Sequence, residues 1–223
     1  MMDGAAGVFV TGTGTEVGKT VVAAAVARTL AAEGERVAVF KPCVTGLDEG
    51  GESDHQLLRR ASGSSQGDEE IAPYRYGPPA SPHLAASLAS EEIDPQRLRE
   101  AAGTAAASAD AIVCEGVGGL LVPLALGYSV RDLAVDLGYP LVVAATPGLG
   151  TINHTLLTIE AALAAGLEVG AVVLTPWPDR PSEIETSNRE TIAALGDAPV
   201  LTLPPLDLAA PESWPPLALP PND

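Results

Sequence analysis

An apolar strand that runs directly into a glycine-rich loop and then into a helix constrains this chain more than any other feature. Val8-Phe9-Val10 precedes the segment Thr11-Gly-Thr-Gly-Thr-Glu-Val-Gly-Lys-Thr20, and an alanine-rich stretch follows it. Glycines allow backbone N–H groups to approach phosphate oxygens, and the start of a helix adds partial positive charge. The order of strand, glycine loop, Gly-Lys-Thr and helix therefore predicts a binding site for a nucleoside triphosphate.

The residues expected to contact the nucleotide lie at the end of this loop and in the first helical turn. They are Gly14, Thr15, Glu16, Val17, Gly18, Lys19 and Thr20. We expect Lys19 to reach the β- and γ-phosphates and the Thr20 hydroxyl to bind Mg²⁺. The usual pattern places its first glycine at position 13, which is threonine here, with Gly12 and Gly14 on either side. The flanking strand and helix favour a phosphate loop over a flexible glycine-rich turn.

Length and charge limit the other functions open to the chain. Its 223 residues are predicted to form a single domain, 1–223. The net charge of −17 argues against nucleic acid and against a membrane surface as partners, because both require basic surfaces. No apolar run reaches the ~18 residues of a transmembrane helix. Cys43 and Cys114 give no disulfide or metal-binding pattern, and no signal peptide is visible, so a cytoplasmic location is expected.

Apolar strands and helices alternate along the chain. Strands are predicted at 7–11, 37–40, 111–114, 141–145, 169–174 and 199–203, and helices at 19–33, 54–60, 83–90, 95–108, 129–138, 151–165 and 182–195. Near-continuous runs of Val, Ala, Leu and Ile between helices are typical of a buried parallel sheet. We therefore predict an α/β fold of the P-loop NTPase type, with three layers and a mostly parallel central sheet flanked by helices.

Two segments are predicted to lack regular structure. Residues 63–82 are rich in Gly, Ser, Pro and acidic side chains and are predicted to form a long surface loop. The tail, 204–223, is rich in proline, which excludes a helix or a central strand. We expect Pro204 and Pro205 to lie along the nucleotide pocket and the end of the tail to be extended or disordered.

Chemically suggestive residues follow the predicted strands. Lys41 comes directly after the strand at 37–40, and Glu115 ends the strand at 111–114. Ligands of open parallel sheets bind beyond the carboxyl ends of the strands. There Lys41 can neutralise a γ-phosphate, and Glu115 can bind Mg²⁺ beside the phosphate loop. Lys19 and Lys41 are the only lysines of the chain, so both fall next to predicted phosphate chemistry.

Two helix starts carry weaker signals when they are taken alone. Asp54 follows Ser53 at the start of a helix, where an acidic residue commonly serves as a cap or interacts with the helix dipole. Thr151, Ile152 and Asn153 open another helix, whose free N–H groups could hold a carboxylate.

Together these segments resemble the dethiobiotin synthetases, the ATP-dependent ring-closing enzymes of biotin synthesis. The resemblance runs in family order over most of the chain. It rests on the phosphate loop and on Lys41-Pro-Cys-Val-Thr-Gly46, Ser53-Asp54, Ser81-Pro-His83, Glu115-Gly-Val-Gly-Gly119 and Leu149-Gly-Thr-Ile-Asn-His154.

The resemblance implies both a reaction and residue roles. In this family CO₂ and one amine of 7,8-diaminononanoate form a carbamate, which attacks the γ-phosphate of ATP, and the second amine then closes the cyclic urea. By this likeness Lys41 and Lys19 are catalytic, Thr45 binds the carbamate, and Thr20, Asp54 and Glu115 bind Mg²⁺. Thr151, Ile152 and Asn153 would bind the distant carboxylate of a substrate held at the subunit interface of a homodimer.

Two questions stay open at this point. Thr175 stands where members of the family commonly place an asparagine that reads adenine, so triphosphates other than ATP are not excluded. The alternative function is a partition-type P-loop ATPase switch, which the glycine loop alone would also suit. Such switches usually carry an extra lysine early in the loop, and this loop contains only Lys19.

Overall fold

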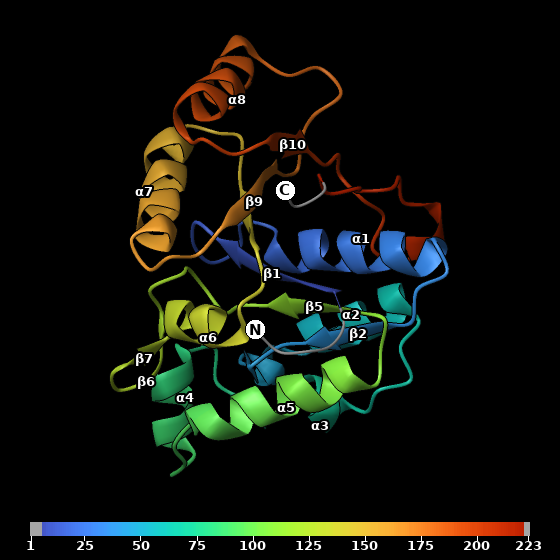
Figure 1. The fold of residues 1–223 in the computed structure, drawn as a ribbon, viewed down its shortest axis with the longest axis vertical. Coiled ribbons are helices and arrows are strands. Elements are labelled where there is room, and N and C mark those ends of the chain that lie inside the picture. The colour runs from blue at the N-terminus through green and yellow to red at the C-terminus, as the bar shows by residue number, and fades with distance from the viewer. Residues whose placement is uncertain (1–5, 221–223) are drawn as a thin grey trace.

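A six-stranded parallel sheet forms the centre of the computed structural model, which describes residues 6–220 (Figure 1). The strand order is β10-β9-β8-β1-β5-β2, and all neighbouring strands are parallel. The strands are β1 (Ala6–Gly12), β2 (Val37–Phe40), β5 (Ala111–Glu115), β8 (Leu141–Ala145), β9 (Val169–Leu174) and β10 (Val200–Thr202). The predicted α/β fold with a mostly parallel sheet is confirmed, and each predicted strand is present.

Helices cover both faces of this sheet. They are α1 (Lys19–Ala32), α2 (Asp54–Ser62), α3 (Asp68–Ile71), α4 (Pro82–Leu88), α5 (Pro95–Ala107), α6 (Val130–Leu137), α7 (Thr151–Leu163) and α8 (Glu183–Leu195). Successive strand residues point to opposite faces, so Val10 packs with α1 and α2 while Phe9 packs with α5 and α6. Helices α7 and α8 cover Val143 and Val172 near the other edge. Within residues 6–220, no helix combines the length and apolar character needed to cross a membrane.

The position of β1 in the middle of the sheet determines where the site can form. It pairs with β5 on one side and with β8 on the other, and its register places Val10 opposite Glu115. Because the strands are parallel, the phosphate loop after β1 and the carboxylate at the end of β5 meet at the same edge. The sheet therefore brings together residues that are about a hundred positions apart in the sequence.

The segment 63–82 is more ordered than the sequence predicted. It contains α3 and the strand β4 (Tyr74–Arg75), which pairs in parallel with β3 (Cys43–Val44). Ile71 and Tyr74 are buried in the core. The prediction of one long surface loop was wrong here. The few apolar residues of this polar stretch show no periodicity in the sequence, and β4 becomes a strand only because the distant strand β3 pairs with it. Short elements elsewhere are β6 (Pro123–Ala125), β7 (Tyr128–Ser129), and the 3₁₀ turns η1 (Leu47–Glu49) and η2 (Pro211–Ser213).

The proline-rich tail packs along α1, as its red trace shows in Figure 1. Trp214 and Leu217 are buried against this helix. The Leu217 N–H donates to Thr29 Oγ1 at 2.9 Å, and the Arg60 guanidinium donates to the Leu208 carbonyl at 2.6 Å. As predicted, the tail forms no α-helix and no strand as far as Pro220, but this part is fixed rather than disordered. Residues 221–223 lie outside the described residues.

Candidate active site

The phosphate loop is held against the carboxyl ends of β8 and β9. The Thr13 N–H donates to the Ala144 carbonyl at 3.1 Å, which ties the loop to β8. Gly18 immediately precedes α1 and has φ +88°, a left-handed conformation that favours glycine. A Cβ at this position would lie 2.5 Å from Thr175 Cγ2, so glycine is also required for space. The loop therefore lies so close to the end of β9 that a side chain at position 18 would push the loop away from Thr175.

The first two residues of α1 direct polar groups into the site. Lys19 Nζ donates to the Gly14 carbonyl at 2.7 Å, so its side chain turns back over the loop. Burial lowers the pKa of Lys19, although the nearby Glu115 carboxylate opposes this shift. The Thr20 hydroxyl donates to Glu115 Oε1 at 2.8 Å. The end of the phosphate loop is thereby connected to the end of β5.

A buried ammonium group lies between two carboxylates. Lys41 Nζ lies 2.6 Å from Glu115 Oε1 and 2.7 Å from Asp54 Oδ2. Lys41 is only 2% exposed and Glu115 is fully buried. Burial by itself would lower the pKa of Lys41, but the charges of Glu115 and Asp54 outweigh it and the net shift is upward. The ammonium therefore stays charged and keeps a fixed position.

The oxygen atoms around Lys41 suit a hard cation such as Mg²⁺. Glu115 Oε2 is buried and has no hydrogen-bond partner among residues 6–220. Asp54 and the Thr20 hydroxyl bring further oxygen atoms to the same place. The described residues hold no group of three or more His, Cys, Asp or Glu side chains that could bind a metal. The chain thus offers a partial set of ligands, as in sites where phosphate oxygens and water complete the octahedron around Mg²⁺.

These groups line a cleft of about 750 Å³ beyond the carboxyl ends of the strands. Most of the predicted site residues border it: Thr15, Glu16, Gly18, Lys19, Thr20, Lys41, Thr45, Asp54 and Glu115. A volume of this size is within the range of small-molecule and cofactor sites. The fold therefore gathers the residues predicted for phosphate, metal and carbamate binding around one space.

The remaining predicted residues lie elsewhere in this chain. Gly14 borders an adjacent cavity of about 540 Å³, and Val17 packs over Gly12. Thr175 is buried beneath Gly18, whereas Pro204 is half-buried and Pro205 is exposed just after β10.

The predicted carboxylate-binding residues at the start of α7 do not line the 750 Å³ cleft of their own chain. Thr151 is buried, Ile152 is half-buried and Asn153 is exposed.

Several residues that line the cleft were not identified from the sequence. Glu49 comes from η1 and Val117 from the loop after β5, and the segment from Pro79 to Pro82 closes another side. The Ser-Pro-His and Glu-Gly-Val-Gly-Gly motifs could have indicated the last two. Nothing in the acidic segment around Glu49 distinguishes it from solvated surface.

Comparison with known proteins places these residues in a family. Residues 6–213 match a family model described as an AAA domain. The ATP-dependent dethiobiotin synthetase BioD of Anaeromyxobacter dehalogenans is 47% identical over 168 residues, which is 75% of each chain. The enzymes with the same name from Rhodococcus erythropolis and Bacillus subtilis are 40% and 35% identical, covering 88% and 89% of this chain and 87% of each relative.

The chain belongs to the dethiobiotin synthetase family. This membership confirms the resemblance that the sequence motifs indicated. All residues around the cleft fall within the matched range 6–213.

Solved structures support the fold alone. Chloroplast FtsY from Physcomitrella patens has a TM-score of 0.53 and 15% identity, covering 92% of this chain and 60% of that one. The signal recognition particle receptor FtsY from Elizabethkingia anophelis gives the same TM-score at 13% identity, covering 92% of this chain and 61% of that one.

Proposed function

We propose that this chain is an ATP-dependent dethiobiotin synthetase, a cyclo-ligase that converts 7,8-diaminononanoate, CO₂ and ATP into dethiobiotin, ADP and phosphate. The observation that carries this proposal is the convergence of Lys19, Lys41 and Thr45 on one cleft with the phosphate loop. It occurs in a chain 35–47% identical to enzymes with that name. A cytoplasmic location fits the proposed use of ATP and CO₂.

The first step forms the carbamate. One amine of the diamine attacks the carbon of CO₂ and loses a proton, which leaves a carbamate with a negative oxygen. Thr45 follows β3 and borders the same cleft as Lys41, which supports a role for its hydroxyl as a hydrogen-bond donor to a carbamate oxygen. Such a contact would hold the nucleophile in position for the next step.

The second step transfers the γ-phosphoryl group. A carbamate oxygen attacks the γ-phosphorus, ADP leaves, and a carbamic–phosphoric anhydride forms. Lys19 and Lys41 stabilise the negative charge that moves across the phosphoryl group, and their fixed positions mean that little reorganisation is needed. Thr20, Asp54 and Glu115 would hold Mg²⁺, which supplies further neutralisation of phosphate charge when it is bound.

The third step closes the ring. The second amine attacks the carbonyl carbon of the anhydride, the bond to the phosphate oxygen breaks, and a proton is released. The products are the cyclic urea and inorganic phosphate. Lys41 remains near the departing phosphate, where its charge stabilises the leaving group.

A homodimer would complete the substrate site. The start of α7, with Thr151, Ile152 and Asn153, offers helix N–H groups but lies outside the 750 Å³ cleft of its own chain. Leu149, just before the start of α7, is 95% exposed. We propose that the start of α7 receives the substrate carboxylate at the cleft of a neighbouring subunit.

The first prediction separates this synthetase from a partition-type ATPase switch. Omitting diaminononanoate or bicarbonate should reduce phosphate release from ATP at least about tenfold, because unpositioned water replaces the carbamate nucleophile poorly. Removing Mg²⁺ with EDTA should abolish the remaining turnover. The measurement is the steady-state rate of phosphate release with each component omitted in turn. Full-rate hydrolysis without the diamine would favour the switch.

The second prediction concerns the base of the nucleotide. Thr175 is 3% exposed and lies beneath Gly18, and it has no carboxamide to pair with the donor and acceptor of adenine. Weak discrimination follows, because the wrong base leaves few polar groups unpaired. We expect CTP and GTP to reach kcat/KM within roughly tenfold of ATP, or about 1.4 kcal/mol. Parallel measurements with ATP, CTP, GTP and UTP test this, and a thousandfold preference for ATP would contradict it.

A further inference from the structure

The loop that joins β8 to α7 has little rigidity of its own. It runs over residues 146–150, and Gly150 has φ +91°, a left-handed conformation that favours glycine. Pro147 is its only buried residue, and the side chain of Leu149 is directed to solvent with 95% of the residue exposed. Packing against the core therefore does little to fix this loop, and its position depends on hydrogen bonds from neighbouring elements.

Asn188 supplies these hydrogen bonds from α8, which lies beside α7 (Figure 1). Its Nδ2 atom donates to the Pro147 carbonyl at 2.9 Å and to the Gly148 carbonyl at 3.0 Å, so both amide hydrogens are used. In the described part of the chain, no other side chain forms a hydrogen bond to residues 146–150. Asn188 is 7% exposed and shares the buried face of α8 with Ile192. A buried amide at such a position is costly unless it is hydrogen-bonded, so the two bonds to the loop keep it there.

The same hydrogen bonds reach the first turn of α7. The Gly148 carbonyl also accepts from the Thr151 N–H at 3.3 Å, which connects Asn188 to the first residue of the helix. The next two N–H groups, of Ile152 and Asn153, have no acceptor among the described residues, and Gly150 offers no side-chain cap. By contrast, the N-caps of α5, α6 and α8 accept N–H groups through their side chains.

We propose that Asn188 is a positioning residue for recognition of the substrate carboxylate. By holding two consecutive loop carbonyls, it fixes the directions of the Ile152 and Asn153 N–H groups. Donors that are already ordered bind an anion without a further loss of loop entropy. This role rests on the proposed function, in which the start of α7 receives the carboxylate at the cleft of a neighbouring subunit. Asn188 itself lines no part of the 750 Å³ cleft, so it acts through the loop.

The experiment compares 7,8-diaminononanoate with its carboxamide analogue, which is nearly equal in shape but uncharged at the distant end. Wild-type protein should prefer the carboxylate at least about tenfold in kcat/KM, because hydrogen bonds to a charged acceptor are stronger. Asn188→Leu keeps a branched side chain but removes both donors, so this preference should fall about three- to tenfold. The loss should appear in the KM for diaminononanoate and leave kcat within about twofold, because the carboxylate is remote from the reacting atoms.

Ile192→Val is the matched control for the stability of α8. It removes a methylene group from the same buried face without touching the loop, so the thermal midpoint should fall while the carboxylate preference stays at the wild-type value. Asn188→Ala removes the same donors with a smaller side chain and replaces Asn188→Leu if leucine prevents folding.

The outcomes distinguish the role of Asn188 from the proposed function. If wild-type protein turns over no diaminononanoate, the proposed function is overturned and the role of Asn188 falls with it. If wild type is active but uses both substrates equally, or if the Asn188 variants lose activity equally on both, only the positioning role is overturned. A carboxylate preference that stays at the wild-type value in these variants has the same consequence.

Discussion

Replacing Lys41 by alanine is expected to lower kcat by roughly 10²–10³, while the affinity for nucleotide changes much less. The Lys41 ammonium is buried and held between Glu115 and Asp54, so it does not have to reorganise when charge develops on the phosphoryl group. Its interaction should therefore be stronger in the transition state than in the bound ground state. Steady-state kinetics for kcat, together with a separate binding titration for nucleotide, measure the two effects.

A matched control separates loss of catalysis from loss of stability. Without Lys41, the buried Glu115 carboxylate loses its ion-pair partner, which can cost about 3–5 kcal/mol in a fully buried pair and should cost less here, because the Asp54 side chain is 46% exposed and Lys19 remains nearby. The variant should therefore be assayed well below its thermal midpoint. Lys41→Arg keeps the charge and should unfold closer to wild type. If Lys41→Ala keeps a near-wild-type kcat and only raises the nucleotide KM, Lys41 is a ground-state binder and the proposed role is wrong.

The second large effect is expected from Gly18→Ala, which should weaken nucleotide binding about 10- to 100-fold, the equivalent of roughly 1–3 kcal/mol. Alanine at φ +88° is strained, and its Cβ would lie 2.5 Å from Thr175 Cγ2. Relief of this clash requires the loop to move, which displaces the backbone N–H groups from the phosphates. Isothermal titration with a non-hydrolysable triphosphate measures the loss.

Two further variants show whether strain or the clash is responsible. Gly34→Ala places alanine at φ +98° with nothing within 4 Å of its Cβ, so it should reduce stability but leave nucleotide binding unchanged. Adding Thr175→Ser to Gly18→Ala removes the clashing methyl group and should recover part of the affinity. Wild-type affinity in Gly18→Ala would show that this loop does not cradle the phosphates.

The local sequence determined the fold class and the centre of the site. The runs around Phe9, Ile112 and Val142 are continuously apolar because their strands are buried on both faces, so each strand is recognisable without knowledge of its neighbours. The loop before Lys19 is recognisable from the sequence alone, because its glycines and the helix start that follows it are what phosphate binding requires. Lys41 and Glu115 follow strands directly, and the rule that parallel strands end at one edge is sufficient to place them together.

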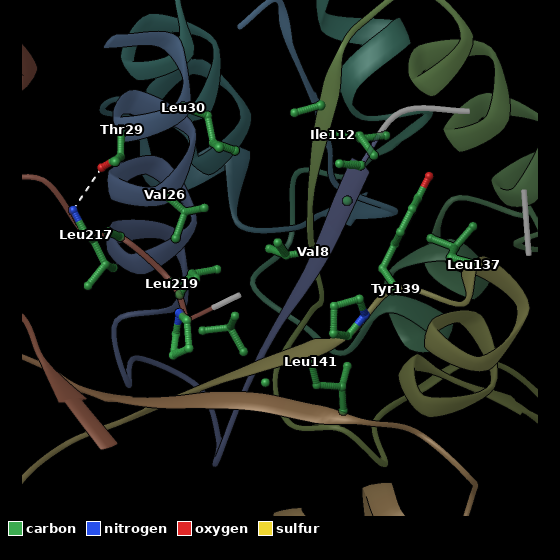
Figure 2. A pocket seen from close by; sticks show the side chains of 18 of the residues that line it. Val8, Val26, Thr29, Leu30, Ile112, Leu137, Tyr139, Leu141, Leu217 and Leu219 are labelled. Carbon is green, nitrogen blue, oxygen red and sulfur yellow. Dashed lines mark hydrogen bonds between the residues drawn. The ribbon is translucent and has the colours of Figure 1, made fainter. Parts of the chain in front are cut away.

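Only the tertiary structure decided how these residues interact. Asp54 alone is an ordinary helix-start acid, and it contacts Lys41 because α2 packs beside the end of β2. The pairing of β4 with β3, the burial of Trp214 of the tail against α1, and the position of Thr175 beneath Gly18 are likewise non-local. A cavity beside Tyr139 (Figure 2) also forms where the amino ends of the strands, α1 and the tail meet. Such contacts join segments far apart in the chain, and no local pattern encodes them because each partner is compatible with many environments until the other is in place.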